Sequence, residues 1–394
     1  MRKLFLFVFF ISFIGITKAQ VLQGKIVDEV TGVGIPFASI GIIGTNNATV
    51  TNETGGFILR VSTYPAKLRF SHVSYLLAEI IITESSNDLI VKLKPATISL
   101  SEVTIDPFKG QRIVKAALEK AIANQATNFY TNAFYRQLTT LNNKPNQIYE
   151  LFYDLKWNAK GIQGWIAKQS RLAEQHDQIA FSFDNQSYFT FSFGGQLSPE
   201  RKGKLITLTN LNEYEIVIEK YIEQPAQNIA VISCKYKSTK KNQFYVNTTY
   251  YIGIDNLNIY RLENSLFNLP MRFSGASKRY PPLATTISTF NGNDHIIPVL
   301  ESISTKLQVS LSVSGQENNS TVQSLLTVYN IDENLKKEQF QNLNIKTKDK
   351  KVRESIKYDA IFWKNNPIVK QTTLEDSFIK MMESKQAFGT MTNP

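Results

Sequence analysis

Short apolar segments alternate with turn residues about every ten residues between positions 21 and 93. One of the turns is residues 52–56, Asn-Glu-Thr-Gly-Gly, where glycine adopts a positive φ without strain. Seven short strands at this spacing are typical of a β-sandwich. The expected strands cover residues 22–28, 35–42, 49–51, 57–61, 67–72, 78–83 and 89–93.

An ordered set of motifs runs through the same segment. It comprises Gly24-Lys25-Ile26-Val27-Asp28, Thr31-Gly32, Ile35-Pro36-Phe37-Ala38-Ser39-Ile40, residues 51–57, residues 68–75, Leu89-Ile90-Val91-Lys92-Leu93 and residues 100–105. This set resembles the carboxypeptidase regulatory-like domain family, although Val73-Ser74-Tyr75 lacks the glycine that the family usually carries before the tyrosine. The resemblance implies a seven-stranded, transthyretin-like sandwich over residues 20–95. It also implies a domain that often precedes TonB-dependent outer-membrane nutrient receptors, and it implies no peptidase activity.

The first nineteen residues have the layout of a secretory signal peptide. Arg2 and Lys3 precede an apolar run over residues 4–16, and small residues follow. The run is shorter than the roughly 20 residues that a membrane-spanning helix needs. We therefore predict a signal peptide over residues 1–19, cleaved between Ala19 and Gln20. No cysteine directly follows the apolar run, so the sequence predicts no lipoprotein anchor, and no later stretch is apolar enough for a transmembrane helix.

Residues 96–110 contain Pro107 and Gly110, are predicted to be a linker, and include a short strand expected at residues 103–105. The pattern then becomes helical over residues 111–128, where Val114, Leu118 and their neighbours form one apolar stripe. We expect this stripe to pack on a sheet.

After the helix, the sequence returns to strands. The expected strands are residues 132–139, 147–154, 216–222, 229–236, 243–255, 258–263, 304–314 and 320–329. Consecutive antiparallel strands predict a large curved sheet or an open half-barrel within a second domain, residues 111–394. Its many aromatic side chains are expected to form the core, although a concave aromatic face for an apolar ligand stays open. The predicted fold class is mainly β.

A final helix is expected from Thr373 to Phe388, with Thr373 as its N-cap and two acidic residues in its first turn. This segment, residues 113–124 and Ala133-Phe134-Tyr135-Arg136 resemble a family of uncharacterised bacterial envelope proteins. Those proteins join a regulatory-like sandwich to a β-rich region. The resemblance implies no catalytic residues.

The chain offers few groups for catalysis or metal binding. His72, His176 and His295 lie in separate segments without metal-ligand spacing, and there is one cysteine. Cys234 lies in an apolar strand and is expected to be a buried, inert thiol, with Lys235 on the opposite face.

Two carboxylates are also considered as a catalytic pair for glycoside hydrolysis. Glu150 and Asp154 would lie about 13 Å apart on one strand face, too far for a glycosidase pair, and are expected to be surface charge. The sequence therefore predicts no catalytic residue, no cofactor and no metal.

Together these features predict an exported, non-enzymatic protein of the cell envelope. Its net charge of +11 is spread over short clusters that are typical of solvated loops. The expected partner is an envelope protein, a glycan or an apolar ligand, with peripheral membrane contact allowed and no nucleic acid. The expected location is the periplasm, the outer membrane or the medium. Two alternatives stay open: a hydrolase whose site is assembled from distant residues, and an accessory to a TonB-dependent receptor.

Overall fold

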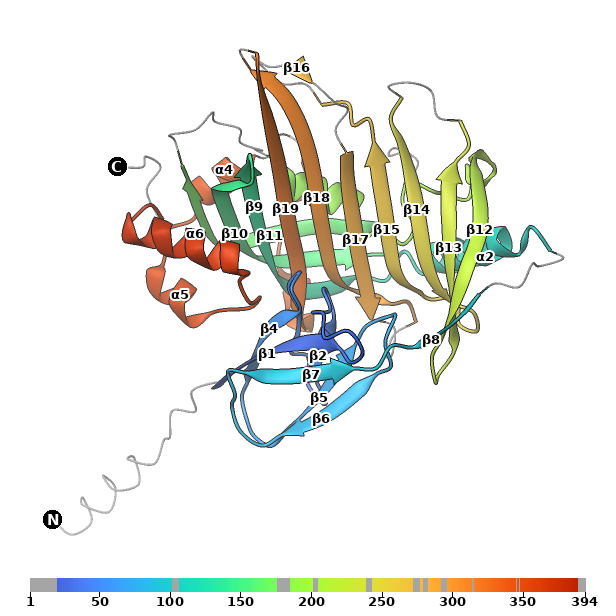
Figure 1. Ribbon diagram of the computed structural model, residues 1–394, viewed down its shortest axis with the longest axis horizontal. Coiled ribbons are helices and arrows are strands. Elements are labelled where there is room, and N and C mark those ends of the chain that lie inside the picture. Colours follow the sequence, from blue (N-terminus) through green and yellow to red (C-terminus); the bar gives the residue numbers. More distant parts are fainter. Residues whose placement is uncertain are drawn as a thin grey trace, which may run out of the picture.

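The computed structural model describes residues 20–100, 106–175, 185–200, 205–238, 243–271, 277–278, 283–291, 296–313, 315–344, 346 and 348–388 (Figure 1). An N-terminal sandwich is followed by one much larger antiparallel sheet that carries helices on both faces. The predicted fold class is confirmed. Within the described residues, no helix is long and apolar enough to cross a membrane.

The sandwich consists of two facing sheets with strand orders β4-β1-β7 and β3-β2-β5-β6. Their strands are β1 (Gln20–Asp28), β2 (Ser39–Ile42), β3 (Ala48–Val50), β4 (Gly56–Val61), β5 (Ala66–Ser71), β6 (Ala78–Ile82) and β7 (Leu89–Leu93). Phe57 and Phe70 meet edge to face between the sheets, with ring centroids 6.2 Å apart. Gly24 is required in β1, because a Cβ there would lie 2.2 Å from the Leu89 carbonyl oxygen. The seven predicted strands are all present.

The large sheet has the order β11-β10-β9-β19-β18-β17-β15-β14-β13-β12-β8, and β16 pairs with β18. Its strands are β8 (Thr97–Leu100), β9 (Phe129–Leu141), β10 (Lys144–Asn158), β11 (Gly161–Glu174), β12 (Tyr214–Glu223), β13 (Asn228–Tyr236), β14 (Tyr245–Gly253), β15 (Ile259–Phe267), β16 (Ser277–Lys278), β17 (Leu283–Asn291), β18 (Val299–Val313) and β19 (Gln316–Ile331). Strand β8 lies in the segment 96–110 and joins the sheet edge beside β12. The short strand expected at residues 103–105 lies outside the described residues.

The large sheet curls until strands that are distant in its order come into contact. The rings of Trp157 in β10 and Phe290 in β17 lie 6.1 Å apart, although three strands separate β10 from β17. Helices α2 (Lys109–Ala123) and α3 (Gln186–Phe193) occupy the hollow, where Leu118 and Phe191 join the same buried cluster as Trp157. The aromatic side chains on this concave face are therefore core, as predicted, and the stripe of α2 packs on the sheet.

Three short helices follow the sheet: α4 (Asp349–Glu354), whose Val352 joins the concave core, and α5 (Ala360–Asn365) and α6 (Thr373–Ser384), which cover the opposite face of the sheet. Side chains alternate along β10, so Tyr149 faces the concave core while Ile148 and Phe152 face α6 and α5. Both faces of the sheet are thus buried along β9 to β11.

The N-cap of α6 differs from the prediction. Thr372, and not Thr373, caps the helix: its hydroxyl accepts a hydrogen bond from the Glu375 backbone N–H. The Glu375 carboxylate accepts one from the Thr372 N–H at 2.7 Å in return, which completes a capping box. The helix therefore begins at Thr373, one residue earlier than a cap at Thr373 would place its start, and it ends at Ser384.

The sandwich lies across one end of the large sheet (Figure 1). The antiparallel order brings the end of β12, the starts of β13, β15 and β18, and the ends of β17 and β19 to this one end. Strand β3 of the sandwich contacts β19 there. Any space between the two parts is consequently walled by residues far apart in the sequence.

Candidate functional site

The contact between the sandwich and the rest of the chain combines apolar packing, in which Val73 and Leu76 join a cluster with Ile222 and Ile229, with direct hydrogen bonds. Side chains of the sandwich donate hydrogen bonds to backbone carbonyl oxygens: Asn46 to Ile331 at 3.0 Å, Thr49 to Ile368 at 2.9 Å and Asn52 to Lys370 at 3.0 Å. In the other direction, Gln224 Nε2 donates to the carbonyl oxygens of Val73 and Tyr75 at 3.0 and 2.9 Å. Directional bonds of this kind fix how the two parts meet, and they leave cavities between them.

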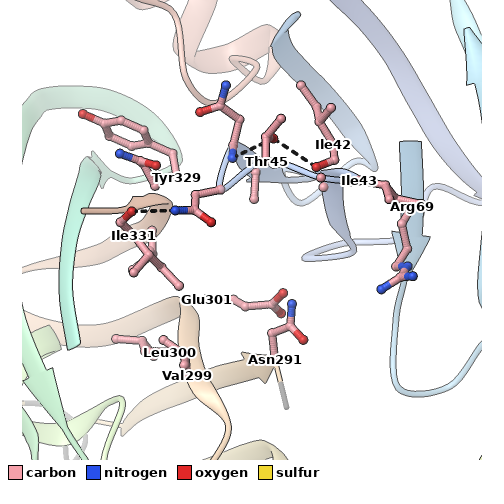
Figure 2. Close-up of a pocket in the computed structure, with 17 residues that line it drawn as sticks. Ile42, Ile43, Thr45, Arg69, Asn291, Val299, Leu300, Glu301, Tyr329 and Ile331 are labelled. Carbon is pink, nitrogen blue, oxygen red and sulfur yellow. Dashed lines mark hydrogen bonds between the residues drawn. The ribbon is translucent and has the colours of Figure 1, made fainter. Parts of the chain in front are cut away.

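Two cavities lie side by side at this contact. The larger has a volume of about 410 Å³ and lies between the segment after β5 and the β12–β13 turn. The smaller has a volume of about 360 Å³ and lies under the β2–β3 turn. Glu301 of β18 and Asn291 of β17 line both cavities. In Figure 2 the Glu301 carboxyl points into the smaller cavity near the side chain of Asn291.

Glu301 is held in an unusual environment for a carboxyl group. Its Oε1 accepts a hydrogen bond of 2.7 Å from the Ser39 hydroxyl of the sandwich. Burial raises the pKa of Glu301 to about 7, and the Ser39 hydrogen bond opposes that rise. Glu301 therefore changes its charge near neutral pH at the contact between the two domains.

His72 and Arg261 face each other in the larger cavity. The Ser74 backbone N–H donates to His72 Nδ1 at 3.2 Å, and His72 Nε2 lies 3.4 Å from Arg261 Nη1. Burial, and then the charge of Arg261, lower the pKa of His72 to about 3. The imidazole is thus neutral at physiological pH and stands beside a permanent cation.

Neighbouring contacts hold both side chains in place. The ring of Tyr75 packs against that of His72 at 5.3 Å, and the Tyr75 hydroxyl donates to Asp28 at 2.9 Å. Arg261 Nε donates to Glu263 at 2.6 Å, and the guanidinium carbon lies 5.8 Å from the centre of the Tyr251 ring. The polar groups of the cavity are therefore preorganised.

The remaining wall of the larger cavity is largely apolar. Phe37 and Leu77 come from the sandwich, and Ile229 and Phe290 come from the large sheet. The arrangement combines a cationic donor, a neutral donor and a titratable carboxyl with apolar side chains around a space of small-molecule size. It can bind a small amphipathic molecule.

The residues that the sequence singled out do not gather at this site, apart from His72. Ala19 lies outside the described residues, as do His176 and His295, and Gln20 is the first residue of β1. His72 follows β5, as predicted. Among the described residues, no three His, Cys, Asp or Glu side chains are placed to hold a metal ion.

Cys234 is a free, buried thiol in β13, as predicted, and burial raises its pKa. Lys235 is exposed and therefore lies on the opposite face. Nothing in this environment activates the thiol.

The prediction for Glu150 and Asp154 is wrong: both are buried. They lie on the face of β10 that α5 and α6 cover, and a cation on a neighbouring strand neutralises each charge. Glu150 pairs with Arg171 and, at 2.6 Å, with Arg136, and Asp154 pairs with Lys168 at 2.7 Å. Although burial alone would raise it, these two arginines hold the pKa of Glu150 below its usual value. This cluster joins the sheet to the C-terminal helices.

Comparison with known proteins identifies the first domain. The sequence profile of the CarboxypepD_reg-like domain family matches residues 22–105. No curated protein matches the chain.

Solved structures show only remote likeness. A putative outer membrane lipoprotein-sorting protein domain from Vibrio parahaemolyticus is 12% identical, with 58% of this chain and 97% of that chain covered and a TM-score of 0.26. A LolA superfamily protein from Nitrosomonas europaea is 10% identical, with 57% and 97% covered and a TM-score of 0.19. MucB in complex with MucA(peri) is 8% identical, with 54% and 92% covered and a TM-score of 0.18. All three TM-scores lie below 0.5. The profile match and the seven-stranded sandwich agree, and residues 22–105 are a CarboxypepD_reg-like domain.

Proposed function

We propose that this protein is an exported, non-enzymatic binding protein of the cell envelope that holds a small molecule between its sandwich and its large sheet. The observation that carries the proposal is the cavity of about 410 Å³ with His72, Arg261 and Glu301 in an otherwise largely apolar wall. Small-molecule sites are typically 300–1,000 Å³, lie at domain contacts, and combine apolar walls with a few fixed polar groups.

The filled concave face supports the same site. Helices α2 and α3 and the aromatic side chains of β9 to β11 occupy the hollow of the sheet. An apolar ligand on that face would have to displace a close-packed core, which is costly. The cavity at the domain contact needs no such displacement.

His72 is a poor general base, because such a base works best when its pKa lies near the working pH and the pKa of His72 is about 3. Glu301 lines the same cavity and has a pKa of about 7, so a hydrolase is the alternative function. Export is supported by the charged and apolar pattern of residues 1–19, and N-terminal sequencing of the mature protein is expected to begin at Gln20.

The test is to fill the cavity. Ala226 is exposed and lines it from the β12–β13 turn, so Ala226→Trp should occupy the space without disturbing the core. Ala126→Trp places the same side chain at an exposed position after α2 and is the matched control. Each protein is purified from its native envelope, denatured, and analysed for released small molecules by mass spectrometry.

We expect one compound in stoichiometric amount from the wild type and from Ala126→Trp, and its loss from Ala226→Trp. Equal release from all three proteins, or release from none, would refute the proposed site.

A further inference from the structure

Glu301 lies where the two cavities meet, and its one polar partner within the described residues is uncharged. Its Oε1 accepts a hydrogen bond from the Ser39 hydroxyl, which is a neutral donor. No lysine, arginine or histidine side chain of the described part of the chain forms an ion pair with this carboxyl group. A carboxylate that is removed from water without a counter-charge is unfavourable, and burial raises its pKa for this reason.

The arginines on the cavity walls already have carboxylate partners. Arg261 in the larger cavity donates from Nε to Glu263 at 2.6 Å, and Arg69 in the smaller cavity donates from Nε to Glu79 at 3.0 Å. His72 is neutral at physiological pH because its pKa is about 3. These groups therefore do not balance the charge that Glu301 acquires when it ionises.

The tyrosines on the walls do not balance this charge either. Tyr75 and Tyr260 line the larger cavity and Tyr329 lines the smaller one, and a tyrosine is neutral or negative but never positive. Burial raises the pKa of Tyr75 and that of Tyr329 to about 12, so both are neutral at physiological pH. A cation that balances Glu301 thus has to come from outside the described part of the chain.

We propose that the ligand is a small amine whose protonated nitrogen lies against the Glu301 carboxylate at the junction of the two cavities. Its apolar body packs against Phe37, Leu77 and Phe290 in the larger cavity. This inference rests on the proposed function, because it concerns the same cavity. The Glu301 carboxyl points into the cavity beside Asn291, whose amide oxygen can also accept from an ammonium group (Figure 2). Hydrogen bonds between ionised partners are the strong ones.

Binding of an amine should depend on pH through Glu301. The pKa of Glu301 in the empty cavity is about 7, and a bound ammonium group favours the ionised carboxylate and lowers that pKa. The affinity for an amine should therefore rise as the pH rises through about 7. His72 does not change its charge in this range, and an alkylammonium group, with a pKa of about 10, stays protonated.

The first experiment compares three probes on the wild-type protein by isothermal titration calorimetry. These are 2-phenylethylamine, its neutral isostere 2-phenylethanol and the anion 3-phenylpropionate. At pH 8 we expect the amine to bind at least tenfold more tightly than the alcohol, and the anion to bind most weakly. At pH 5.5 the amine should bind at least tenfold more weakly than at pH 8, while the alcohol should be unchanged. This comparison needs no variant, so it does not depend on any variant folding.

The second experiment removes the negative charge. Glu301→Gln retains a side-chain oxygen for the Ser39 hydroxyl, and it should weaken 2-phenylethylamine at least tenfold at pH 8 and abolish the pH dependence. The alcohol should bind as it does to the wild type. Glu119→Gln, at an exposed glutamate of α2 outside both cavities, should change neither probe. Circular dichroism verifies that both variants fold.

The outcomes separate this assignment from the proposed function. Equal affinities for the amine and the alcohol that both disappear in Ala226→Trp would overturn the ammonium assignment and leave the cavity as a binding site. A compound without a basic nitrogen, released from the wild type and lost from Ala226→Trp, would do the same. Failure of every probe to bind would overturn the assignment, and the absence of any released compound would overturn the proposed function as well.

Discussion

Replacement of Glu150 by glutamine should destabilise the protein strongly. The Glu150 side chain is 1% exposed, and it is the common partner of Arg136 and Arg171, each 7% exposed. The neutral amide removes the closest counter-charge of both buried guanidinium groups and leaves each with one more distant carboxylate, Glu375 for Arg136 and Glu383 for Arg171, both at 3.5 Å. Loss of one partner of a buried ion pair costs about 3–5 kcal/mol.

The size of the effect can be followed by the melting temperature. For domains of 150–250 residues, 1 kcal/mol shifts the Tm by about 2–4 °C. We therefore expect Glu150→Gln to lower the Tm by about 6–20 °C in differential scanning calorimetry. The control is Glu119→Gln, which removes an exposed partner of Lys115 3.7 Å away and should shift the Tm by less than about 2 °C.

Acid should abolish the difference between the two proteins. The pKa of Glu150 is lower in the folded protein than in the unfolded chain, so the stability it contributes is present above the unfolded pKa and is lost as the pH falls through the folded pKa. The wild type should therefore approach Glu150→Gln in stability at strongly acidic pH. A change in Tm as small as that of the control, or a constant difference down to strongly acidic pH, would show that Glu150 does not hold these arginines.

Three further predictions concern single groups. Burial raises the pKa of Glu301 to about 7, above its value in the unfolded chain, so the wild type should lose stability as the pH rises from about 4.5 to about 7. Glu301→Gln should not show this loss of stability. Parallel curves of Tm against pH for the two proteins would contradict the prediction. Thr372→Ala removes the N-cap of α6 and should lower the free energy of unfolding, measured by urea denaturation, by about 0.5–2 kcal/mol. Thr373→Ala should lower it by less, and the reverse order would disprove the capping box. Cys234 should react with a thiol reagent only after denaturant is added, and rapid labelling of the native protein would show that β13 opens.

The first domain could be predicted in detail because its information is local. Turn residues separate its strands, and strands such as β5 alternate between buried and more exposed side chains. The large sheet was predicted as a class, but strands β8, β11, β16 and β17 and helices α3, α4 and α5 were missed. Helix α3 reads Gln-Ser-Tyr-Phe-Thr-Phe-Ser-Phe, whose aromatic residues favour a strand, and packing in the hollow of the sheet overrides that preference.

The candidate site could not be predicted, because its residues meet only through the tertiary fold. His72 and Arg261 are 189 residues apart, and Ser39 and Glu301 are 262 residues apart. Local spacing carries no signal for such pairs. The burial of Glu150 was missed for a related reason: its partners lie on neighbouring strands, and its cover comes from helices at the other end of the chain.

The most direct test of the binding site is hydrogen–deuterium exchange of the wild-type protein with its bound compound and after that compound is removed. The cavity is walled by residues 71–77 of the sandwich and residues 224–229 of the large sheet. We predict that the ligand slows amide exchange in both segments together and leaves the strands around the concave core unchanged. Slower exchange confined to that core, or no change in either segment, would contradict a ligand held between the two domains.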